Sequence, residues 1–459
     1  MKVYKRVIQI ELNELSKAVI DQLVAKNKLP IFGKINKNWQ YLTTTSENDY
    51  ENLEPWIQWV TVHTGKSYDE HQIFTLSDVH KLKHTQIWEE LSRNGIESGI
   101  IGSMNIIRRD TKGGTFFPDP WAIYNETYPE SLRPLWDLIS NRVQGHATKK
   151  ITFGDIRKGL KACLSLGLSP TIYFKMAKQI LAQKLNPKTK WKLACVFDEF
   201  LAEIFIRILK KTNYGFYTLF LNAIAHYQHH YWRAFDIKPF KPDIKYDDIN
   251  EDDDPVMHGY EVYDRILKRV LDELGNDPDT LIIIVSALSQ VPYTAKDSEG
   301  GMNYYRLNDH KAFAESIGLP KNEFEIFPLM SRDWQVQYKN EAARQKALGI
   351  LTHLKVDGHT LFNIRENTDG FIFVETAYTM GISDSSEIKN SGGETICRFK
   401  DVFTNIAIKS GHHSGIGNLW ISDAGVIGAG KGREIPLGQL YDVNLQAFGL
   451  AKKPMLQNA

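Results

Sequence analysis

Apolar residues along this chain fall into short continuous runs and into longer runs with helical spacing. Leu281 to Val285 are five apolar residues in succession, and four of them are β-branched. A run of this kind is typical of a strand that is covered on both faces of a sheet. Residues 7–12 predict a second buried strand, and Ser16 is a good N-cap for the helix that follows it.

The first 120 residues alternate between predicted strands and predicted helices. Residues 57–65 predict a helix that ends at Gly65, and residues 84–95 predict a helix with Gly95 after its last turn. Residues 96–105 predict the next strand and its loop. Because strands that alternate with helices form parallel sheets, this order predicts an α/β fold with a mostly parallel sheet between helices.

The character of the sequence changes several times, which predicts a core with two insertions. At 459 residues the chain is too long for one simple core. Residues 1–124 form the first part of the α/β core, and residues 125–215 predict a helical insertion or cap. Residues 216–294 continue the core, residues 295–400 predict a mixed insertion, and residues 401–459 complete the core.

Composition excludes several classes of protein. Hydrophobic residues make up 42% of the chain and the formal net charge is +1, so we expect a soluble globular protein and no nucleic-acid partner. Cys163, Cys195 and Cys397 lack metal-binding spacing, which predicts buried thiols in a reducing compartment. The sequence shows neither a signal-peptide core nor a stretch of membrane-spanning length, and we therefore expect a cytoplasmic protein.

One Lys-rich stretch has two interpretations. Residues 158–185 read KGLKACLSLGLSPTIYFKMAKQILAQKL and are both basic and apolar. This composition is compatible with contact to a membrane surface, but an ordinary amphipathic pair of surface helices is the favoured interpretation.

Five segments occur in the order found in one enzyme family. They are RVIQIELNELS, LEPWIQWVTVHTGKSYDEHQI, LNAIAHYQHHYWRAFD, TLIIIVSALSQ and SGHHSGIGNLWISDAG. In this order they resemble the alkaline phosphatase superfamily, in particular its type I phosphodiesterase and nucleotide pyrophosphatase branch. The resemblance implies an alkaline-phosphatase-like core, with phosphoryl chemistry at two metal ions that flank a Ser or Thr nucleophile.

The metal ligands that the resemblance implies are mostly absent. Family aspartates correspond to Asn13, Ala225 and Ala287, a family histidine corresponds to Leu288, and only the two histidines His229 and His413 are kept. One metal site then has no ionisable ligand, and the other has two imidazoles without a carboxylate. Since a stable divalent site usually needs three protein ligands, we expect no metal and no cofactor.

The remaining polar residues near the inferred site are candidates for a different chemistry. Glu54 falls near the family's nucleophile position, and we assign candidate catalytic roles to Glu54, His229, His413 and Glu14 as acid, base or nucleophile. Candidate substrate-binding residues are Asn13, Trp56, Gln58, Trp59, His63, Asn105, Asp119, Trp121, Gln228, Ser289, Gln290 and His412. Each of these residues also has a purely structural interpretation, such as a cap, a loop anchor or a core aromatic.

The resulting hypothesis is a metal-independent, or at least non-dinuclear, hydrolase or transferase. Its expected partner is a phosphorylated or nucleotide-linked sugar, and the resemblance implies a setting in bacterial surface-polysaccharide synthesis. Two alternatives stay open. One is a nucleotide-sugar-dependent glycosyltransferase with a glycan acceptor, and the other is a non-catalytic pseudoenzyme that binds a phosphorylated ligand.

Overall fold

The computed structural model contains one large sheet with helices on both sides. It describes residues 2–47, 52–76, 78–122, 126–143, 152–241, 246, 248–319, 323–329, 332–366, 370–426 and 433–451. The sheet has eight strands in the order β20-β2-β19-β6-β1-β5-β3-β4. Their bounds are β1 Arg6–Leu12, β2 Gln40–Thr45, β3 Ser98–Ile101, β4 Thr115–Phe117, β5 Phe216–Leu221, β6 Thr280–Ser286, β19 Ile416–Ile421 and β20 Glu434–Pro436.

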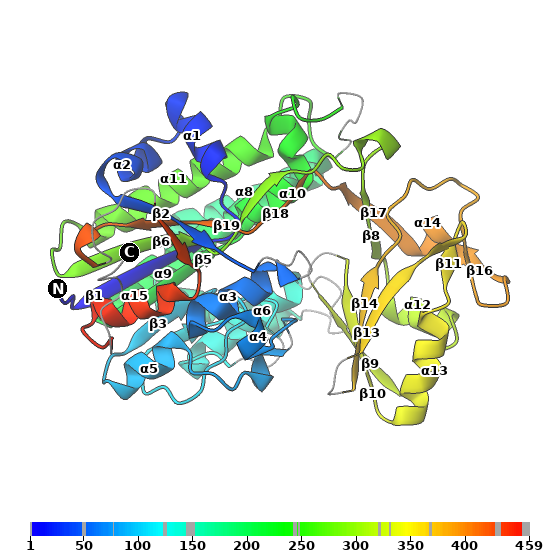
Figure 1. Ribbon diagram of the computed structural model, residues 1–459, viewed down its shortest axis with the longest axis horizontal. Coiled ribbons are helices and arrows are strands. Elements are labelled where there is room, and N and C mark those ends of the chain that lie inside the picture. The colour runs from blue at the N-terminus through cyan, green and yellow to red at the C-terminus, as the bar shows by residue number, and fades with distance from the viewer. Residues whose placement is uncertain are drawn as a thin grey trace.

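The predicted α/β architecture with a mostly parallel sheet is confirmed. Strand β1 runs parallel to both β5 and β6, and β3 runs parallel to β4 and β5. Strand β19 runs antiparallel to its neighbours β2 and β6. Figure 1 shows helices α2 and α11 on one side of this sheet and helices α3, α5 and α15 on the other.

The two faces of the sheet are covered by separate hydrophobic clusters. Ile8, Ile10 and Leu12 of β1 pack into one hydrophobic cluster, together with a first set of helices. Val7 packs into the cluster on the opposite face, together with a second set. This alternation follows from the two-residue period of a strand. The first set is α1 Lys17–Ala25, α2 Pro30–Asn38, α9 Leu193–Lys211, α10 Ala223–Phe235 and α11 Pro255–Leu274, and the second is α3 Pro55–Thr64, α5 Ile87–Arg93 and α15 Gln439–Ala447.

The helical insertion contributes α9 to the first helix set and adds further helices outside it. Its helices are α6 Arg133–Val143, α7 Phe153–Leu166 and α8 Pro170–Leu185, followed by α9. Buried residues of α7 and α8, including Ala162, Cys163 and Ile172, join the same hydrophobic cluster as α9. Helices α7 and α8 therefore form an additional layer over α9.

The mixed insertion has its own hydrophobic cluster, formed by residues between Tyr305 and Phe403. It contains an antiparallel sheet of β13 Phe362–Glu366, β14 Phe371–Thr376, β10 Trp334–Tyr338 and β9 Phe324–Pro328. A smaller sheet consists of β12 His359–Thr360, β11 Lys355–Val356, β15 Glu387–Lys389 and β16 Thr395–Arg398, and the helices are α12 His310–Ser316, α13 Glu341–Leu351 and α14 Phe399–Val402. Figure 1 shows this insertion, in yellow to orange, beside the core.

Two strand pairs connect the insertion to the core. Strand β8 (Asn303–Leu307) pairs antiparallel with β17 (Phe403–Ile408), and β7 (Ser289–Pro292) pairs antiparallel with β18 (Gly411–Ser414). The segment that contains His412 and His413 forms strand β18, because β7 supplies its hydrogen-bonding partner.

Candidate active site

The candidate site lies at the carboxyl edge of the parallel strands. Asn13 and Glu14 follow β1, helix α10 follows β5, and strand β7 follows β6. Strand β18 reaches the same edge because it precedes β19, which runs in the opposite direction. In open α/β sheets this edge is where ligands bind.

Glu14 is held in an unusual backbone conformation. Its φ is +57°, a left-handed value that costs a residue with a side chain about 1–2 kcal/mol. Ser286 stabilises the following turn, because its Oγ accepts a hydrogen bond from the backbone N–H of Leu15 at 2.9 Å. Non-glycine residues in this conformation cluster at functional sites.

The Glu14 carboxylate meets two imidazoles. Its Oε2 lies 2.9 Å from Nε2 of His229 and 3.4 Å from Nε2 of His413. The two Nε2 atoms are 3.2 Å apart. Three electron-rich atoms at these distances repel one another unless a proton or a cation lies between them.

Helix α10 is kinked so that His229 can take this position. Tyr231 has non-helical φ and ψ angles, and the backbone N–H of Trp232 donates to Ser410 Oγ at 2.8 Å. The backbone N–H of Ser410 in turn donates to the His229 carbonyl at 2.7 Å. Ser410 thus inserts into the hydrogen-bond ladder of the helix, which is a recognised cause of kinks.

The orientation of the His229 ring is fixed from its other nitrogen. Nδ1 lies 3.2 Å from the carbonyl oxygen of Gly411. When Nδ1 donates its proton there, a neutral His229 directs the lone pair of Nε2 toward Glu14. This is the arrangement of metal-ligating histidines, whose second ring nitrogen donates to a carbonyl or carboxylate.

Buried glutamines hold Glu14 from both sides. Gln290 Nε2 donates to the Glu14 carboxylate oxygen Oε2 and also to the carbonyl of Ala225 at 3.0 Å. Gln228 Nε2 donates to the backbone carbonyl of Glu14 at 2.7 Å. Both side chains are fully buried, so they position the carboxylate rather than contact a substrate.

Glu54 is the second carboxylate of the site. It is the N-cap of α3, although its side chain makes no capping hydrogen bond. Its Oε2 lies 3.8 Å from Nδ1 of His413, and the side chain is 31% exposed. Glu54 therefore forms the accessible side of the cluster, where a substrate can reach it.

The four groups perturb each other's proton affinities. Burial alone would raise the pKa of Glu14, but the charges of His413 and His229 hold that pKa well below its usual range. Burial lowers the pKa of His229. For His413, burial is outweighed by Glu14 and Glu54, which raise its pKa. Burial, reinforced by the charge of Glu14, raises the pKa of Glu54.

The donor set of this cluster fits one divalent metal ion. Glu14, His229 and His413 each offer one ligand atom, and these atoms lie within 4.8 Å of one another. One carboxylate with two imidazoles is a common set for zinc. The expectation of no metal assumed two imidazoles without a carboxylate, and Glu14, the neighbour of the matched Asn13, supplies the missing group.

The other matched positions carry no ionisable side chain. Ala287 and Leu288 are fully buried in the apolar cluster of the α3 side. Asn13 is engaged by its neighbours, since its Nδ2 donates to Asn222 Oδ1 at 2.8 Å and its Oδ1 accepts from Trp59 Nε1 at 2.8 Å. These positions therefore offer no carboxylate to a metal ion.

Polar groups of the mixed insertion and of the segment that follows it lie near the cluster, and the sequence interpretation missed them. The Lys409 ammonium lies 5.9 Å from the ring centroid of Tyr304, and the Arg332 guanidinium lies 4.6 Å from the same centroid. Lys409 also acts electrostatically on Glu54, His229 and His413. No family motif marks these residues, although Lys409 directly precedes the SGHH segment.

Several predicted substrate-binding residues are instead structural. Trp59 is fully buried and bonds Asn13, so it cannot stack on a sugar or a base. Gln58 is also fully buried, and its Nε2 donates to the Asn52 carbonyl at 2.8 Å. His63 forms a buried pair with Glu11 at 2.9 Å. For these three residues, the prediction is wrong because helix α3 is covered on nearly all sides.

Two further predicted binding residues anchor a loop. Asn105 Nδ2 donates to the carbonyl oxygens of Trp56 and Thr75. Asp119 accepts hydrogen bonds from the backbone N–H groups of Asn105 and Trp121 at 3.2 and 2.8 Å. Both Asn105 and Asp119 are buried, and their prediction as ligand contacts is therefore corrected.

The remaining candidates keep a surface that a ligand can reach. Trp56, Trp121, Ser289 and His412 are half-buried. His412 alternates with His413 along β18, and its ring lies 5.7 Å from that of Tyr293. A role of these four residues in ligand binding stays a prediction.

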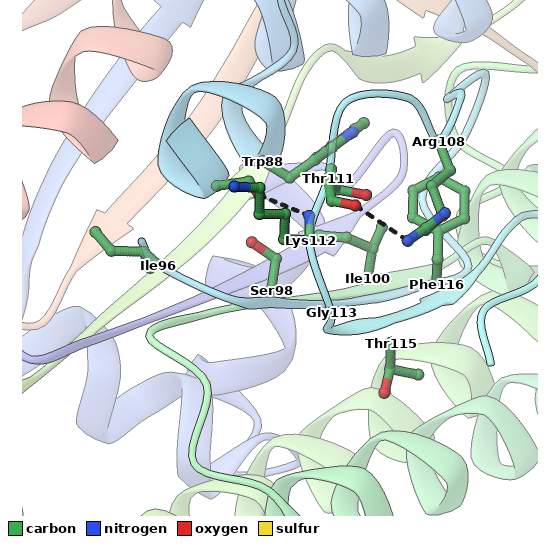
Figure 2. Close-up of a pocket in the computed structure, with 11 residues that line it drawn as sticks. Trp88, Ile96, Ser98, Ile100, Arg108, Thr111, Lys112, Gly113, Thr115 and Phe116 are labelled. Carbon is green, nitrogen blue, oxygen red and sulfur yellow. Dashed lines mark hydrogen bonds between the residues drawn. The ribbon is translucent and has the colours of Figure 1, made fainter. Parts of the chain in front are cut away.

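A small pocket elsewhere in the molecule is unrelated to this cluster. Figure 2 shows it beside β3 and β4, where Trp88, Ile100 and Phe116 contribute apolar walls. Ser92 Oγ accepts from the backbone N–H of Lys112, and Arg108 donates to the carbonyl of Thr111. These two hydrogen bonds hold the loop that borders the pocket, which contains none of the residues of the Glu14 cluster.

Comparison with known proteins returns similar structures at low sequence identity. No protein-family profile matches the chain, and no curated protein matches it in sequence. A phosphonoacetate hydrolase from Sinorhizobium meliloti, in complex with phosphonoformate, is 11% identical and has a TM-score of 0.43, with 97% of this chain and 96% of that chain covered. Murine ectonucleotide pyrophosphatase/phosphodiesterase 5 is 12% identical with a TM-score of 0.41, covering 99% and 97%.

A third similar structure is the alkaline phosphatase TAB5, in a histidine-to-aspartate variant with magnesium bound. It is 12% identical with a TM-score of 0.40, and the match covers 98% of this chain and 99% of that chain. All three proteins belong to the alkaline phosphatase superfamily, which the sequence motifs indicated. At these identities and TM-scores the likeness carries no argument about activity.

Proposed function

We propose that this protein is a hydrolase or transferase of phosphate esters, with a non-dinuclear centre formed by Glu14, His229, His413 and Glu54. The contact between the left-handed Glu14 and the two imidazoles carries the proposal. A strained residue, two carboxylates and two imidazoles at the ligand-binding edge of a sheet are costly for stability, and such groups persist where chemistry requires them.

The buried residues of the cluster and its accessible residue have different roles. Glu14, His229 and His413 would hold one divalent ion, which supplies Lewis-acid stabilisation of phosphoryl oxygens when bound. Glu54 is the accessible group, and its Oε2 accepts the proton of the attacking water or hydroxyl group. His413 links the two positions, because its Nε2 faces Glu14 while its Nδ1 faces Glu54.

The charge around the site supports an anionic substrate. The Lys409 ammonium lies near the Tyr304 ring, and a cationic side chain of this kind binds phosphate oxygens. Arg332, beside the same ring, is paired with Glu375 at 2.8 Å. Within this class, a phosphorylated or nucleotide-linked sugar is the narrower proposal. It rests on the family resemblance and on the half-buried Trp56 and Trp121 rather than on Trp59.

The test combines a substrate panel with metal analysis. Purified protein is assayed with p-nitrophenyl phosphate, bis-p-nitrophenyl phosphate and a set of nucleoside diphosphate sugars, before and after chelation and with added zinc or manganese. Elemental mass spectrometry measures bound metal in the wild type and in Glu14→Gln. We expect turnover of at least one ester and one metal ion or none per chain. Activity should be strongly reduced in Glu14→Gln, because the substitution removes the carboxylate of the donor set.

A control variant shows whether the effect of Glu14→Gln comes from the site or from the loss of any negative charge. Glu299→Gln removes a surface carboxylate that pairs with Lys296 and should leave turnover and metal content unchanged. Two metal ions per chain would contradict the non-dinuclear proposal. Ligand binding without turnover would favour the pseudoenzyme, and nucleotide release only with a glycan acceptor would favour the glycosyltransferase.

A further inference from the structure

The outer face of helix α7 is apolar although it faces solvent. Phe153, Ile156, Leu160 and Leu164 follow one another at helical spacing, and Phe153 and Leu164 are 83% and 71% exposed. An ordinary surface helix shows the opposite arrangement, with its apolar stripe against the core. The buried side of α7 consists of small residues instead, namely Gly159, Ala162 and Cys163.

Helix α8 repeats the pattern. Phe174, Leu181 and Leu185 lie on one side of this helix at seven- and four-residue spacing, and Phe174 and Leu185 are 70% and 79% exposed. Ile180 adds a further exposed apolar side chain. Only Leu168 and Ser169 separate Gly167, the C-cap of α7, from the start of α8. The two exposed stripes therefore lie on consecutive helices joined by a short connection, here called the α7–α8 hairpin.

The remaining sides of the hairpin are anchored to the protein. Ser169 donates its backbone N–H to Glu203 of α9 at 3.0 Å, and Lys175 pairs with Glu199 of α9. Gln179 donates to the carbonyl of Thr189 at 2.7 Å. The hairpin is thus docked by its inner side, and the described residues leave the apolar stripes uncovered.

The charge of this region is strongly positive. Residues 152–192 contain nine Lys or Arg residues and a single acidic residue, Asp155, whereas the whole chain has a net charge of only +1. Arg157, Lys161 and Lys178 lie beside the apolar stripes and are exposed. Apolar stripes flanked by cations are the pattern of helices that lie in the interface of an anionic membrane.

We propose that the α7–α8 hairpin docks this protein onto an anionic lipid surface. The helices lie on the membrane, with Phe153, Leu164, Phe174 and Leu185 in the acyl boundary and the lysines at the headgroups. None of the described helices is long and apolar enough to span a bilayer, which agrees with peripheral binding. The proposal is independent of the proposed function.

Charge complementarity selects this occupant over two others. A second copy of the chain would bring two basic hairpins together, and the like charges would repel each other. An acidic protein would satisfy the charges, but it would need an apolar face that matches two separate helical stripes. Anionic lipid provides both the charge and a deformable apolar phase.

Vesicle co-sedimentation tests the proposal with the full chain. The protein is mixed with vesicles of pure phosphatidylcholine and with vesicles of equal parts phosphatidylcholine and phosphatidylglycerol, at low and at high salt. We expect binding to the mixed vesicles, weaker binding at high salt, and little binding to phosphatidylcholine alone.

Two variants address the two components of binding. The first variant combines Lys158→Gln, Lys161→Gln and Lys178→Gln. It should weaken partition of the protein onto the mixed vesicles on the order of 100-fold, since each cation near an anionic surface contributes about fivefold to the partition coefficient. The second variant combines Phe153→Ser, Leu164→Ser, Phe174→Ser and Leu185→Ser, and it should abolish binding to the mixed vesicles. All seven side chains are exposed, so circular dichroism melts should remain close to those of the wild type.

Matched controls alter the same residue types elsewhere. Lys311→Gln with Lys346→Gln, and Met380→Ser with Ile382→Ser, change exposed residues of the mixed insertion and should leave partition unchanged. Absence of binding to the mixed vesicles would overturn the proposal. The proposal would also be overturned if the serine variant bound the mixed vesicles as well as the wild type. It would likewise be overturned if the only effect of the serine variant were a change from dimer to monomer.

Discussion

Glu14 and His229 face each other across the carboxyl edge of the sheet, with 2.9 Å between Oε2 and Nε2. Neither residue would reach the other from an undistorted element. Glu14 needs a left-handed backbone, and His229 needs the kink that Ser410 introduces into α10. Two local distortions at one contact indicate that the geometry of this contact is maintained against its energetic cost.

Gln290 is expected to position Glu14 for its role. Gln290→Leu keeps a buried side chain of similar size but removes the donor to the carboxylate and the bond to Ala225. Outer partners of this kind typically account for about 10–100-fold in metal affinity or activity. We expect a loss in that range, measured as metal dissociation by titration with a fluorescent chelator and as kcat/KM. Equal activity of both proteins would show that Glu14 needs no such support.

Gly411 is expected to tolerate no side chain. A Cβ there would lie 2.2 Å from Gln290 Oε1 and 2.5 Å from the Gln228 carbonyl oxygen. Gly411→Ala should therefore separate β18 from α10 and lower the free energy of unfolding by about 3 kcal/mol or more. Urea unfolding measures this change.

Gly349→Ala is the matched control. Gly349 lies in α13 and has no heavy atom near its would-be Cβ. Alanine should stabilise this helix by about 0.5–1 kcal/mol. Similar effects of the two substitutions would contradict the close contact at Gly411.

The buried Asp119 should make stability depend on pH. Burial raises its pKa from the ordinary 3.8 to about 7, so the folded protein binds this proton more tightly than the unfolded chain. The stabilisation is complete below the ordinary pKa and is lost as pH rises through the folded-state pKa. Between about pH 4 and about pH 7 the loss amounts to at most about 4 kcal/mol.

The comparison with Asp119→Asn isolates this group. The variant cannot titrate at this position, so its free energy of unfolding should fall less than that of the wild type across the same interval. Urea unfolding at several pH values gives both slopes. Parallel slopes in the two proteins would mean that Asp119 is ionised throughout.

The positive charge of Lys409 is expected to strengthen binding of the anionic part of the substrate. It is buried, and its ammonium lies 4.8 Å from the Tyr293 ring and 5.9 Å from the Tyr304 ring. Lys409→Met retains the aliphatic packing but removes the charge, and it should raise KM by about tenfold or more for a phosphate ester. Lys400→Met, at a surface lysine paired with Asp384, should leave KM unchanged. Steady-state kinetics at constant ionic strength decides between these outcomes.

The fold could be predicted well from local patterns. Buried runs such as that of β6 identify central strands, and strand–helix alternation gives a parallel sheet regardless of detailed contacts. Gly65 was predicted to end a helix, and it has the positive φ that such a C-cap needs. These features depend on neighbours along the chain, which a sequence displays directly.

The site could be predicted only in part. Glu14, Glu54, His229 and His413 were all candidates, and the structure brings them together. The conformation of Glu14 and the complete burial of Trp59 depend on packing between distant segments, which no local pattern encodes. Tyr304 and Arg332 were missed because they lie in an insertion without a family motif.

The pairing of β7 with β18 also bears on how the mixed insertion relates to the chemistry. Tyr293 donates its backbone N–H to the carbonyl of Ser410, and Gln290 lies opposite His413. The whole insertion thus occupies the tip of a hairpin whose two legs carry site residues. Each leg is anchored separately to α10, since Gln290 donates to the carbonyl of Ala225 and the backbone N–H of Ser410 donates to the carbonyl of His229. The tip can therefore be enlarged, exchanged or reduced while Gln290 and His413 stay aligned. The architecture separates the part of the molecule that can diversify from the part that must remain constant.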